Sequence, residues 1–230
     1  MTHAVLFDLF ETLVTESTAS ARRASSFAQD LGVNQDAYRS HWRSRRLDVV
    51  LGRCSFRDTL AQIARTLGGT LDHTLLDQLR SERVSQKAAV LRSVDADVLA
   101  TLDDLRAAGL KLAVVTNCFA EDVAAWDSSP LRAYFDVTVF SCAVGLAKPD
   151  SEMYLLACRE LHVSPTRALF IGDGGDDELP GARAAGLRAD RAHWFLSRWP
   201  HATIAHDDPG LWRASDVVHA ATAASSAWTR

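Results

Sequence analysis

Four short apolar runs stand out along the chain, because they lack the polar alternation of a strand with one face in solvent. They cover residues 4–7, 112–115, 137–140 and 168–171. Such runs are typical of parallel strands that are buried on both faces. Helical patterns at 120–126 and 151–161 separate the last three runs. Alternating strands and helices predict an α/β protein with a doubly wound parallel sheet.

A long helical stretch separates the first strand from the rest of the sheet. The pattern predicts a helix over 95–108 that stops at Gly109, after which the chain enters the sheet again. Residues 15–93 therefore form an insertion, and we expect them to be a small α-helical cap domain on a core domain of residues 1–14 and 94–230. Helical patterns within the insertion cover residues 19–31, 35–51, 56–67 and 74–89. Near the end of the chain, residues 214–225 predict a closing helix.

The composition is that of a globular protein, with 230 residues of which 47% are hydrophobic and 23% charged. No apolar run approaches the roughly 20 residues of a membrane helix. Asp8 and Glu11 come too early for a secretory signal, so we expect a cytoplasmic protein that does not enter a membrane. The cysteines are widely spaced and predict neither a zinc site nor a disulfide framework, so free thiols are expected at Cys54, Cys118, Cys142 and Cys158.

The charges are distributed unevenly along the chain. Residues 22–92 hold 13 Lys and Arg against 7 Asp and Glu, a balance of +6, and the remainder carries −10. The basic segment either attracts an anionic substrate or is a solvated helical surface. The sequence has no stripe of basic and aromatic residues of the kind that binds nucleic acid. We therefore expect a small anionic metabolite as the substrate, and the composition leaves monomer and homodimer open.

Polar residues directly follow three of the apolar runs. Asp8 follows the first, Thr116 and Asn117 the second, and Asp173 comes just after the fourth. In open α/β sheets, ligands bind beyond the carboxyl ends of the strands. One such residue alone is readily explained as a turn or a helix cap. The agreement of all three indicates a functional site at this edge.

Four segments carry a resemblance to a known family. They are Phe-Asp-Leu-Phe-Glu-Thr-Leu at 7–13, Val-Thr-Asn at 115–117, Lys-Pro-Asp at 148–150 and Ile-Gly-Asp-Gly-Gly-Asp-Asp-Glu at 171–178. In this order they resemble the four motifs of the haloacid dehalogenase superfamily, over most of the chain. The resemblance implies a hydrolase with a Rossmann-like core and a helical cap of the C1 type.

The resemblance also implies a role for each polar residue of these motifs. Asp8 would be the nucleophile and form a covalent aspartyl intermediate. Lys148 and Thr116 would be catalytic, with Lys148 neutralising charge on Asp8 and on the transferring phosphoryl group. Asn117 would bind phosphoryl oxygens beside Thr116, and Thr12 would orient the loop that carries Asp8.

The fourth motif is acidic, and the resemblance implies that it helps to hold Mg²⁺. Hard cations prefer carboxylate and carbonyl oxygens. Neighbouring carboxylates raise each other's pKa, which favours a bound cation over an empty site. The implied ligands are the carboxylates of Asp8, Asp173, Asp177 and Glu178 and the backbone carbonyl of Phe10. Asp176 is interpreted as a solvated loop residue.

Phe10 departs from the motif of most phosphatases in this superfamily. They carry an aspartate two residues after the nucleophile, as general acid to the leaving alcohol and base to the water. Such help is worth about 100- to 10,000-fold in rate, so this chain should be slow on poor leaving groups. Glu11 or a cap residue could substitute, although Glu11 can equally be a surface residue where the cap linker begins.

An aromatic residue at this position also resembles the 2-haloacid dehalogenases. The dehalogenases bind carboxylate and halide with a segment of their cap, and Trp42-Arg43 followed by Arg45-Arg46-Leu47 is similar to that segment. The alternative is that Trp42 packs under the cap and the arginines lie in solvent. Those enzymes need no metal and have Ser-Ser-Asn where this chain has Gly172-Asp173. The sequence therefore predicts a Mg²⁺-dependent phosphatase for a small phosphorylated metabolite. The alternatives are a haloacid dehalogenase and a catalytically weak phosphate-binding relative.

Overall fold

The computed structural model describes residues 1–17, 24–199 and 209–223. Within these ranges, five parallel strands form one sheet in the order β3-β2-β1-β4-β5. The strands are β1 (Ala4–Phe7), β2 (Lys111–Thr116), β3 (Val137–Phe140), β4 (Ala168–Gly172) and β5 (Arg188–Arg191). The four predicted strands and the α/β class are confirmed. Because β1 is central, its carboxyl end lies between those of β2 and β4.

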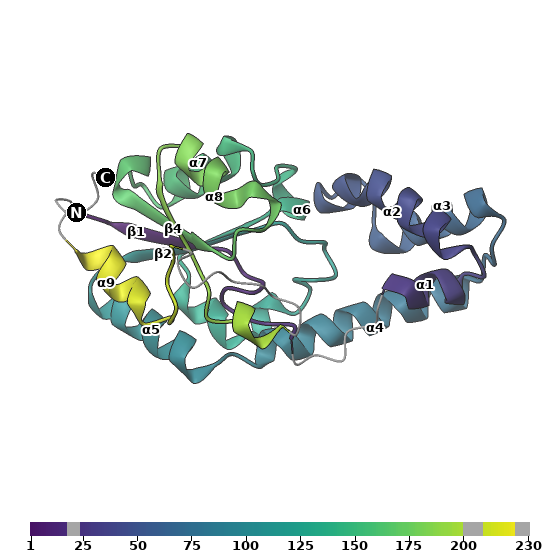
Figure 1. Cartoon of the computed structure of the whole chain (residues 1–230), viewed down its shortest axis with the longest axis horizontal. Coiled ribbons are helices and arrows are strands. Elements are labelled where there is room, and N and C mark those ends of the chain that lie inside the picture. Colours follow the sequence, from purple (N-terminus) through teal and green to yellow (C-terminus); the bar gives the residue numbers. More distant parts are fainter. Residues whose placement is uncertain (18–23, 200–208, 224–230) are drawn as a thin grey trace.

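Helices cover both faces of the sheet, as a doubly wound fold requires (Figure 1). One face packs against α5 (Ala96–Ala107) and α9 (Asp216–Thr222), and the other against α7 (Ser151–Glu160) and α8 (Glu178–Ala184). Successive side chains of a strand point to opposite faces. Since both faces are covered, all four residues of β1 are buried, which explains its unbroken apolar run.

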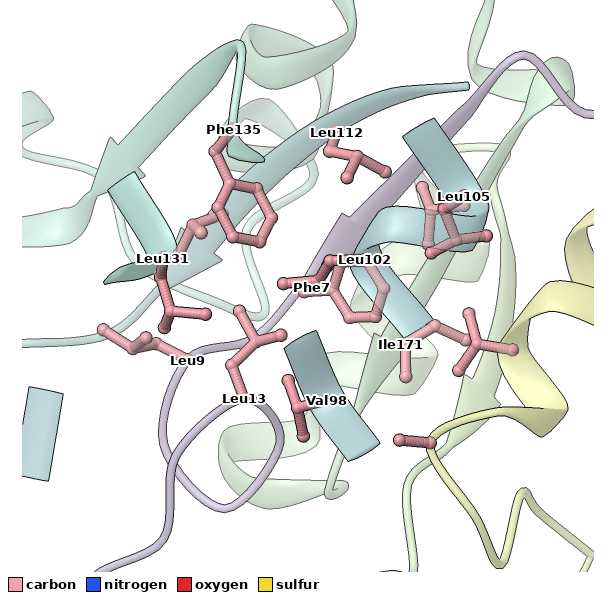
Figure 2. Close-up of a cluster of buried hydrophobic side chains, with 14 of the residues drawn as sticks. Phe7, Leu9, Leu13, Val98, Leu102, Leu105, Leu112, Leu131, Phe135 and Ile171 are labelled. Carbon is pink, nitrogen blue, oxygen red and sulfur yellow. The ribbon is translucent and has the colours of Figure 1, made fainter. Parts of the chain in front are cut away.

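The cluster on the α5 face anchors the loop that follows β1. Figure 2 shows Val98, Leu102 and Leu105 of α5 beside Phe7 of β1. Their spacing places the three side chains on one face of the helix. Leu13, six residues after Phe7, lies in the same cluster and is buried. Packing on this face therefore fixes both ends of the loop that contains Asp8.

In the part of the chain that the structure describes, four helices lie between β1 and α5, to one side of the sheet (Figure 1). They are α1 (Ala24–Asp30), α2 (Gln35–Val50), α3 (Phe56–Leu67) and α4 (His73–Arg92). Asn34, Ser55 and Asp72 cap the N-termini of the last three, because each side chain accepts a hydrogen bond from a backbone N–H of the first turn. The helices share a hydrophobic cluster that Phe119, from beyond β2, also joins. We refer to α1–α4 as the inserted helices.

Helix α4 connects the inserted helices to the sheet. Leu76 and Leu79 in its first half belong to the cluster of the inserted helices. Val90 and Leu91 in its last turns belong to the cluster on the α5 face of the sheet. The helix therefore packs in both clusters, and its last turns hold the inserted helices at the carboxyl edge of the sheet.

The predictions differ from the structure mainly in polar or irregular segments. Strand β5 was missed because Arg-Ala-Asp-Arg is no apolar run, and β5 is an edge strand. The predicted helix at 120–126 is wrong: the chain forms turns there, followed by η1 (Trp126–Ser128) and η2 (Pro130–Tyr134). Burial of β3 on both faces is also wrong, since only Val139 of this edge strand is fully buried.

The remaining predicted helices are confirmed: the one at 56–67 matches α3 at both ends, and the others have at least one shifted end. Residues 19–23 of the first and 224–225 of the last lie outside the described residues. The remaining short helices are α6 (Ser141–Val144), η3 (Pro165–Arg167), η4 (Gly175–Asp177) and η5 (Leu196–Arg198). Within the described ranges, each helix is too short or too polar to span a bilayer.

Candidate active site

Asp8 is the first residue after the central strand. Its N–H donates to the carbonyl of Ile171 on β4 (2.8 Å), which fixes its backbone between neighbouring strands. The side chain is buried, and Oδ1 lies 2.5 Å from Nζ of Lys148. Burial raises the pKa of Asp8, and the charge of Asp173 raises it further, although Lys148 opposes both. The carboxylate of Asp8 is thus held in a buried position at the carboxyl edge of the sheet.

Lys148 lies between two buried carboxylates. Its Nζ donates to Oδ1 of Asp8 and to Oε2 of Glu178. Burial alone would lower the pKa of Lys148, but the charges of Asp8 and Glu178 outweigh burial and raise it. The lysine is therefore a permanent cation in this site, and it joins the first motif to the fourth.

Glu178 begins α8 and is 1% exposed. The N–H of Gly174 donates to its Oε1 (2.8 Å). A Cβ on Gly172 would lie 2.1 Å from the same oxygen, so glycine at the end of β4 makes room for the carboxylate. Tyr154 on α7 donates its hydroxyl to the backbone carbonyl of Glu178 (2.8 Å). Burial raises the pKa of Glu178 to about 8, against the opposing charge of Lys148.

Three carboxylates come together at this edge. Asp8, Asp173 and Glu178 each offer an oxygen within 4.8 Å of the others. Opposite ligands in an octahedral Mg²⁺ shell are about 4.2 Å apart, so a small contraction would let the three oxygens take three positions of such a shell. With Lys148, these groups carry a net charge of −2 when all four are ionised. Their separation, burial and charge fit a divalent cation.

Asn117, just after β2, contacts the backbone on both sides of the Lys148 side chain. Its Oδ1 accepts from the N–H of Lys148 (2.8 Å), and its Nδ2 donates to the carbonyl of Lys148 (3.0 Å). These two bonds fix the peptide groups from which the Lys148 side chain extends. Thr116, the residue before Asn117, is buried at the end of β2. The second motif therefore positions the third.

Asp176 is exposed, as the sequence suggests, but its side chain also has specific partners. Its side chain is 38% exposed, but Oδ2 accepts from Nδ2 of Asn117 (2.9 Å) and lies 3.3 Å from the guanidinium of Arg46 on α2. The backbone φ values of Asp176 and Asp177 are 50° and 52°, in the left-handed region that costs a non-glycine residue energy. Asp176 thus joins the fourth motif, the second motif and the inserted helices.

Phe10 packs against the hydrophobic cluster on the α5 face and also contacts a cation. The ring is half-buried, and Nζ of Lys87 on α4 lies 4.0 Å from its centroid. Lys87 also pairs with Glu16 (2.6 Å). Sequence reasoning missed Lys87, because nothing in its helical pattern marks the face that points towards Phe10.

Glu11 forms contacts within its own loop and with the C-terminal part of the chain. Its Oε2 accepts from the hydroxyl of Thr15 and from Nε1 of Trp199, both at 2.7 Å, and Oε1 accepts from the N–H of Glu16 (2.8 Å). The φ of Glu11 is 58°. These contacts indicate that Glu11 organises the loop, and they do not favour Glu11 as a substitute acid.

Two further residues were predicted for the site, Asp177 as a metal ligand and Thr12 as a residue that binds substrate or orients the Asp8 loop. Asp177 is exposed and is not among the three carboxylates that come together within the described ranges. Thr12 is fully buried, and its Oγ1 has no hydrogen-bond partner in the described part of the chain. The carbonyl of Thr12 accepts from Nε1 of Trp194 (2.9 Å), consistent with an ordered loop. The predicted roles of both residues stay predictions.

Trp42 packs in an aromatic cluster, which agrees with its interpretation as a packing residue. Its ring centroid lies 5.7 Å from that of Phe56 on α3 and 5.8 Å from that of Phe119, which follows the second motif. Arg83 on α4 lies over Phe119 and pairs with Asp122 (2.6 Å). Phe119, in the loop beyond β2, therefore packs against the inserted helices.

The sequence comparisons establish the family. Residues 2–186 match the haloacid dehalogenase-like hydrolase family, so the chain belongs to it and is a hydrolase. It is 29% identical over 194 residues to a glyceraldehyde 3-phosphate phosphatase of Methanopyrus kandleri, covering 81% of this chain and 82% of the relative. It is 32% identical over 177 residues to an N-acetylmuramic acid 6-phosphate phosphatase of Pseudomonas aeruginosa, covering 74% and 72%.

Dehalogenases are also among the similar proteins. The chain is 28% identical over 194 residues to (S)-2-haloacid dehalogenase 1 of a Pseudomonas species, covering 82% of this chain and 83% of the relative. The crystal structure of a 2-haloacid dehalogenase from Pseudomonas syringae superposes with a TM-score of 0.66 at 24% identity, covering 96% of this chain and 99% of that one. This structural likeness establishes a shared fold.

Proposed function

We propose that the protein is a Mg²⁺-dependent phosphatase that acts on a small phosphorylated metabolite through an aspartyl-phosphate intermediate. The observation that carries this proposal is the buried carboxylate of Asp8, paired with Lys148 and grouped with Asp173 and Glu178. A carboxylate attacks a phosphoryl group effectively where fixed positive charge stabilises the transferring oxygens. The two phosphatase relatives support this reaction class.

In the proposed reaction, one oxygen of Asp8 attacks phosphorus and forms an acyl phosphate. The ester P–O bond breaks, and its electron pair leaves with the alcohol oxygen. Lys148 neutralises charge on Asp8 and on the transferring group, while Thr116 would donate a hydrogen bond to a phosphoryl oxygen. Asn117 stays a predicted phosphoryl ligand, and its side-chain amide would have to exchange one of its contacts with Lys148 and Asp176 to serve as one. Water then cleaves the acyl phosphate and releases inorganic phosphate with Asp8 restored.

The acidic group is the proposed Mg²⁺ site. Asp8, Asp173 and Glu178 would hold the ion, and Phe10, through its backbone carbonyl, and Asp177 stay predicted as further ligands. The bound ion would supply charge neutralisation between the nucleophile and the phosphoryl oxygens.

We also propose that residues 15–93 form a cap domain over a core of residues 1–14 and 94–230. All buried members of the hydrophobic cluster of the inserted helices except Phe119 come from residues 15–93, which supports this division. Arg46 shows that the basic helix α2 reaches the fourth motif. A cap with a positive balance at this edge would favour a small anionic substrate. The cytoplasmic location stays a prediction.

One observation favours a second candidate function, a 2-haloacid dehalogenase. Phe10 stands where phosphatases of the superfamily carry their acid, as in the dehalogenases that the sequence resembles, and one relative is a dehalogenase. The buried acidic group argues for the phosphatase, because a dehalogenase needs no metal. A weak phosphate-binding relative is the third outcome to test.

The test is a panel of phosphorylated metabolites and 2-haloacids, assayed for phosphate and for halide release. We expect phosphate release that EDTA abolishes and Mg²⁺ restores, and no release from an Asp8→Asn variant. Phosphate release that survives both EDTA and Asp8→Asn would refute the mechanism. Halide release without metal would select the dehalogenase, and binding of Mg²⁺ or phosphate without turnover would select the weak relative.

A further inference from the structure

Cys118 and Cys142 lie side by side beyond the carboxyl ends of β2 and β3. In the parallel register of these strands, Thr116 is the partner of Phe140, and each cysteine follows two residues later. The two sulfur atoms are 3.8 Å apart, within hydrogen-bond distance for thiols. The spacing of the cysteines along the sequence gives no sign of this contact, which depends on the pairing of β2 with β3.

Ser141 ties the two cysteine segments together. Its Oγ accepts from the N–H of Cys118 (2.9 Å) and donates to the carbonyl of Cys118 (3.1 Å). Ser141 is fully buried and directly precedes Cys142. The proximity of the thiols therefore rests on fixed backbone and not only on side-chain rotation. A disulfide has an S–S distance of about 2.05 Å, so the sulfurs would have to approach by about 1.8 Å.

The two thiols differ in exposure and in acidity. Cys118 is 2% exposed, whereas Cys142 is half-buried and open to small solutes. The hydrogen bond from Cys118 lowers the pKa of Cys142, while that bond and burial raise the pKa of Cys118. The thiolate is the reactive form of cysteine. Cys142 is thus suited to be the attacking thiol, and Cys118 the thiol that resolves the product.

We propose that Cys118 and Cys142 are a redox-active pair that a peroxide converts to a disulfide beside the active site. The Cys142 thiolate attacks one oxygen of hydrogen peroxide, the O–O bond breaks, and hydroxide leaves, giving a sulfenic acid. The sulfur of Cys118 then attacks the sulfur of Cys142, and the S–O bond breaks as the S–S bond forms. The thiol protons leave with the two oxygens, so the two thiols and one peroxide give a disulfide and two waters.

The disulfide would act on the active site through Asn117. Asn117 directly precedes Cys118 and holds the backbone of Lys148 through its two hydrogen bonds. On the other side, the end of α2 packs on Cys142: a Cβ on Gly52 would lie 2.0 Å from the carbonyl of Cys142. Because the end of α2 packs behind Cys142, formation of the S–S bond should draw the Cys118 segment towards Cys142. This movement would loosen the contact between Asn117 and Lys148.

The first experiment measures the disulfide itself. The full-length protein is treated with hydrogen peroxide, its remaining thiols are blocked, and its peptides are mapped by mass spectrometry without reduction. We expect a peptide pair joined through Cys118 and Cys142 that dithiothreitol separates. Cys54→Ser is the matched control and should form the same bond, whereas Cys142→Ser should not. Oxidation without this cross-link, or a disulfide only between two chains, would overturn the proposal.

The second experiment measures the effect on Lys148 without depending on any substrate. Hydrogen exchange by NMR reports on the N–H of Lys148, which donates to Asn117. We expect exchange to be about tenfold faster in the oxidised wild type than in the reduced form, and unchanged by peroxide in Cys142→Ser. Turnover of an active substrate should fall about tenfold in parallel and recover with dithiothreitol, because small displacements of catalytic groups are costly. A disulfide that leaves exchange at Lys148 unchanged would refute the coupling.

Discussion

The ammonium of Lys148 and the carboxylate of Asp8 form a buried ion pair with 2.5 Å between Nζ and Oδ1. The two residues are 140 positions apart, and only the parallel sheet brings them together. Asp8 stands at the end of the central strand, and Lys148 is held from the neighbouring strand through Asn117. Charges in such a site are fixed before a substrate arrives, which is the main requirement for electrostatic catalysis.

Lys148→Met should destabilise the protein as well as inactivate it. The variant leaves the carboxyl groups of Asp8 and Glu178 buried without the ammonium group that contacts both. Removal of one partner from a buried ion pair typically costs about 3–5 kcal/mol. We expect a loss of this size in the free energy of unfolding, measured by urea titration at pH 7, together with loss of turnover.

The matched control for Lys148→Met is Arg159→Met. Arg159 pairs with Glu152 at 3.3 Å, but the two side chains are 57% and 55% exposed. Solvent screens such a pair, so its removal should cost less than about 1 kcal/mol. Equal losses in the two variants would show that burial of the Lys148 pair has no energetic consequence.

Mg²⁺ affinity should rise with pH. Burial raises the pKa of Glu178 from 4.5 to about 8, so between these values the folded chain keeps a proton that the unfolded chain has lost. The resulting stability is fully present below pH 4.5 and is lost as the pH rises to about 8. Mg²⁺ must displace the proton on Glu178 to bind there, so Mg²⁺ affinity should increase by up to about tenfold per pH unit below pH 8.

Titration calorimetry of Mg²⁺ binding at a series of pH values tests this dependence. Glu178→Gln carries no titratable group at this position, so the variant should bind more weakly and with a flatter pH profile. The same affinity for the wild type at pH 6 and pH 8 would contradict a raised pKa of Glu178. A profile as steep in Glu178→Gln as in the wild type would assign the proton to another group.

Asp176→Ala should impair turnover with little effect on stability. Its carboxylate links Asn117 to Arg46, but the Arg46 and Asp176 side chains are 48% and 38% exposed. We expect a change of less than about 1 kcal/mol in unfolding and a loss of about tenfold in kcat/KM. Asp127→Ala is the control, because the Asp127 side chain is 97% exposed and lies in η1, outside this contact.

A double-variant cycle separates the contact from the individual side chains. If Asp176 acts through Arg46, then Arg46→Ala should lower kcat/KM as Asp176→Ala does, and the double variant should be no worse than either. Additive losses would show that the two residues act independently.

The strand ends were predictable from the sequence, and most contacts between segments were not. Asp8 and Asp173 follow apolar runs, and a parallel sheet brings such residues to one edge, so their proximity follows from the pattern alone. Lys148 and Glu178 were found only through their motifs. Strand β5 was missed because its residues are polar, and the segment at 120–126 forms turns although its composition suits a helix.

Contacts of the inserted helices depend on helix orientation, which a single sequence does not fix. Arg46 lies among several arginines on α2, and periodicity cannot show that this one meets Asp176. The pair of Cys118 and Cys142 likewise depends on which strands are neighbours and in which register. Tertiary packing determines both features, and local patterns carry little information about it.

Phe10→Asp tests whether the missing acid–base group limits a phosphatase. General acid catalysis gives about 100- to 10,000-fold, and it matters most for alkyl phosphates, whose alcohol is a poor leaving group. However, Nζ of Lys87 lies 4.0 Å from the centroid of the Phe10 ring. A neighbouring cation would lower the pKa of the new carboxyl group and keep it ionised, which suits a base but not an acid.

We therefore expect Phe10→Asp alone to raise kcat for an alkyl phosphate by about tenfold, and the double variant with Lys87→Gln to raise it by about 100-fold. Phe10→Leu, which adds no carboxyl group, is the control and should give no gain. The gain should be small with p-nitrophenyl phosphate in every variant, because its leaving group needs no proton. If halide release is the true activity, Phe10→Asp should instead reduce it and leave alkyl phosphates uncleaved. That result would mean that the aromatic ring at position 10 is part of the substrate pocket, and that the acidic group of Asp8, Asp173 and Glu178 serves a purpose other than phosphoryl transfer.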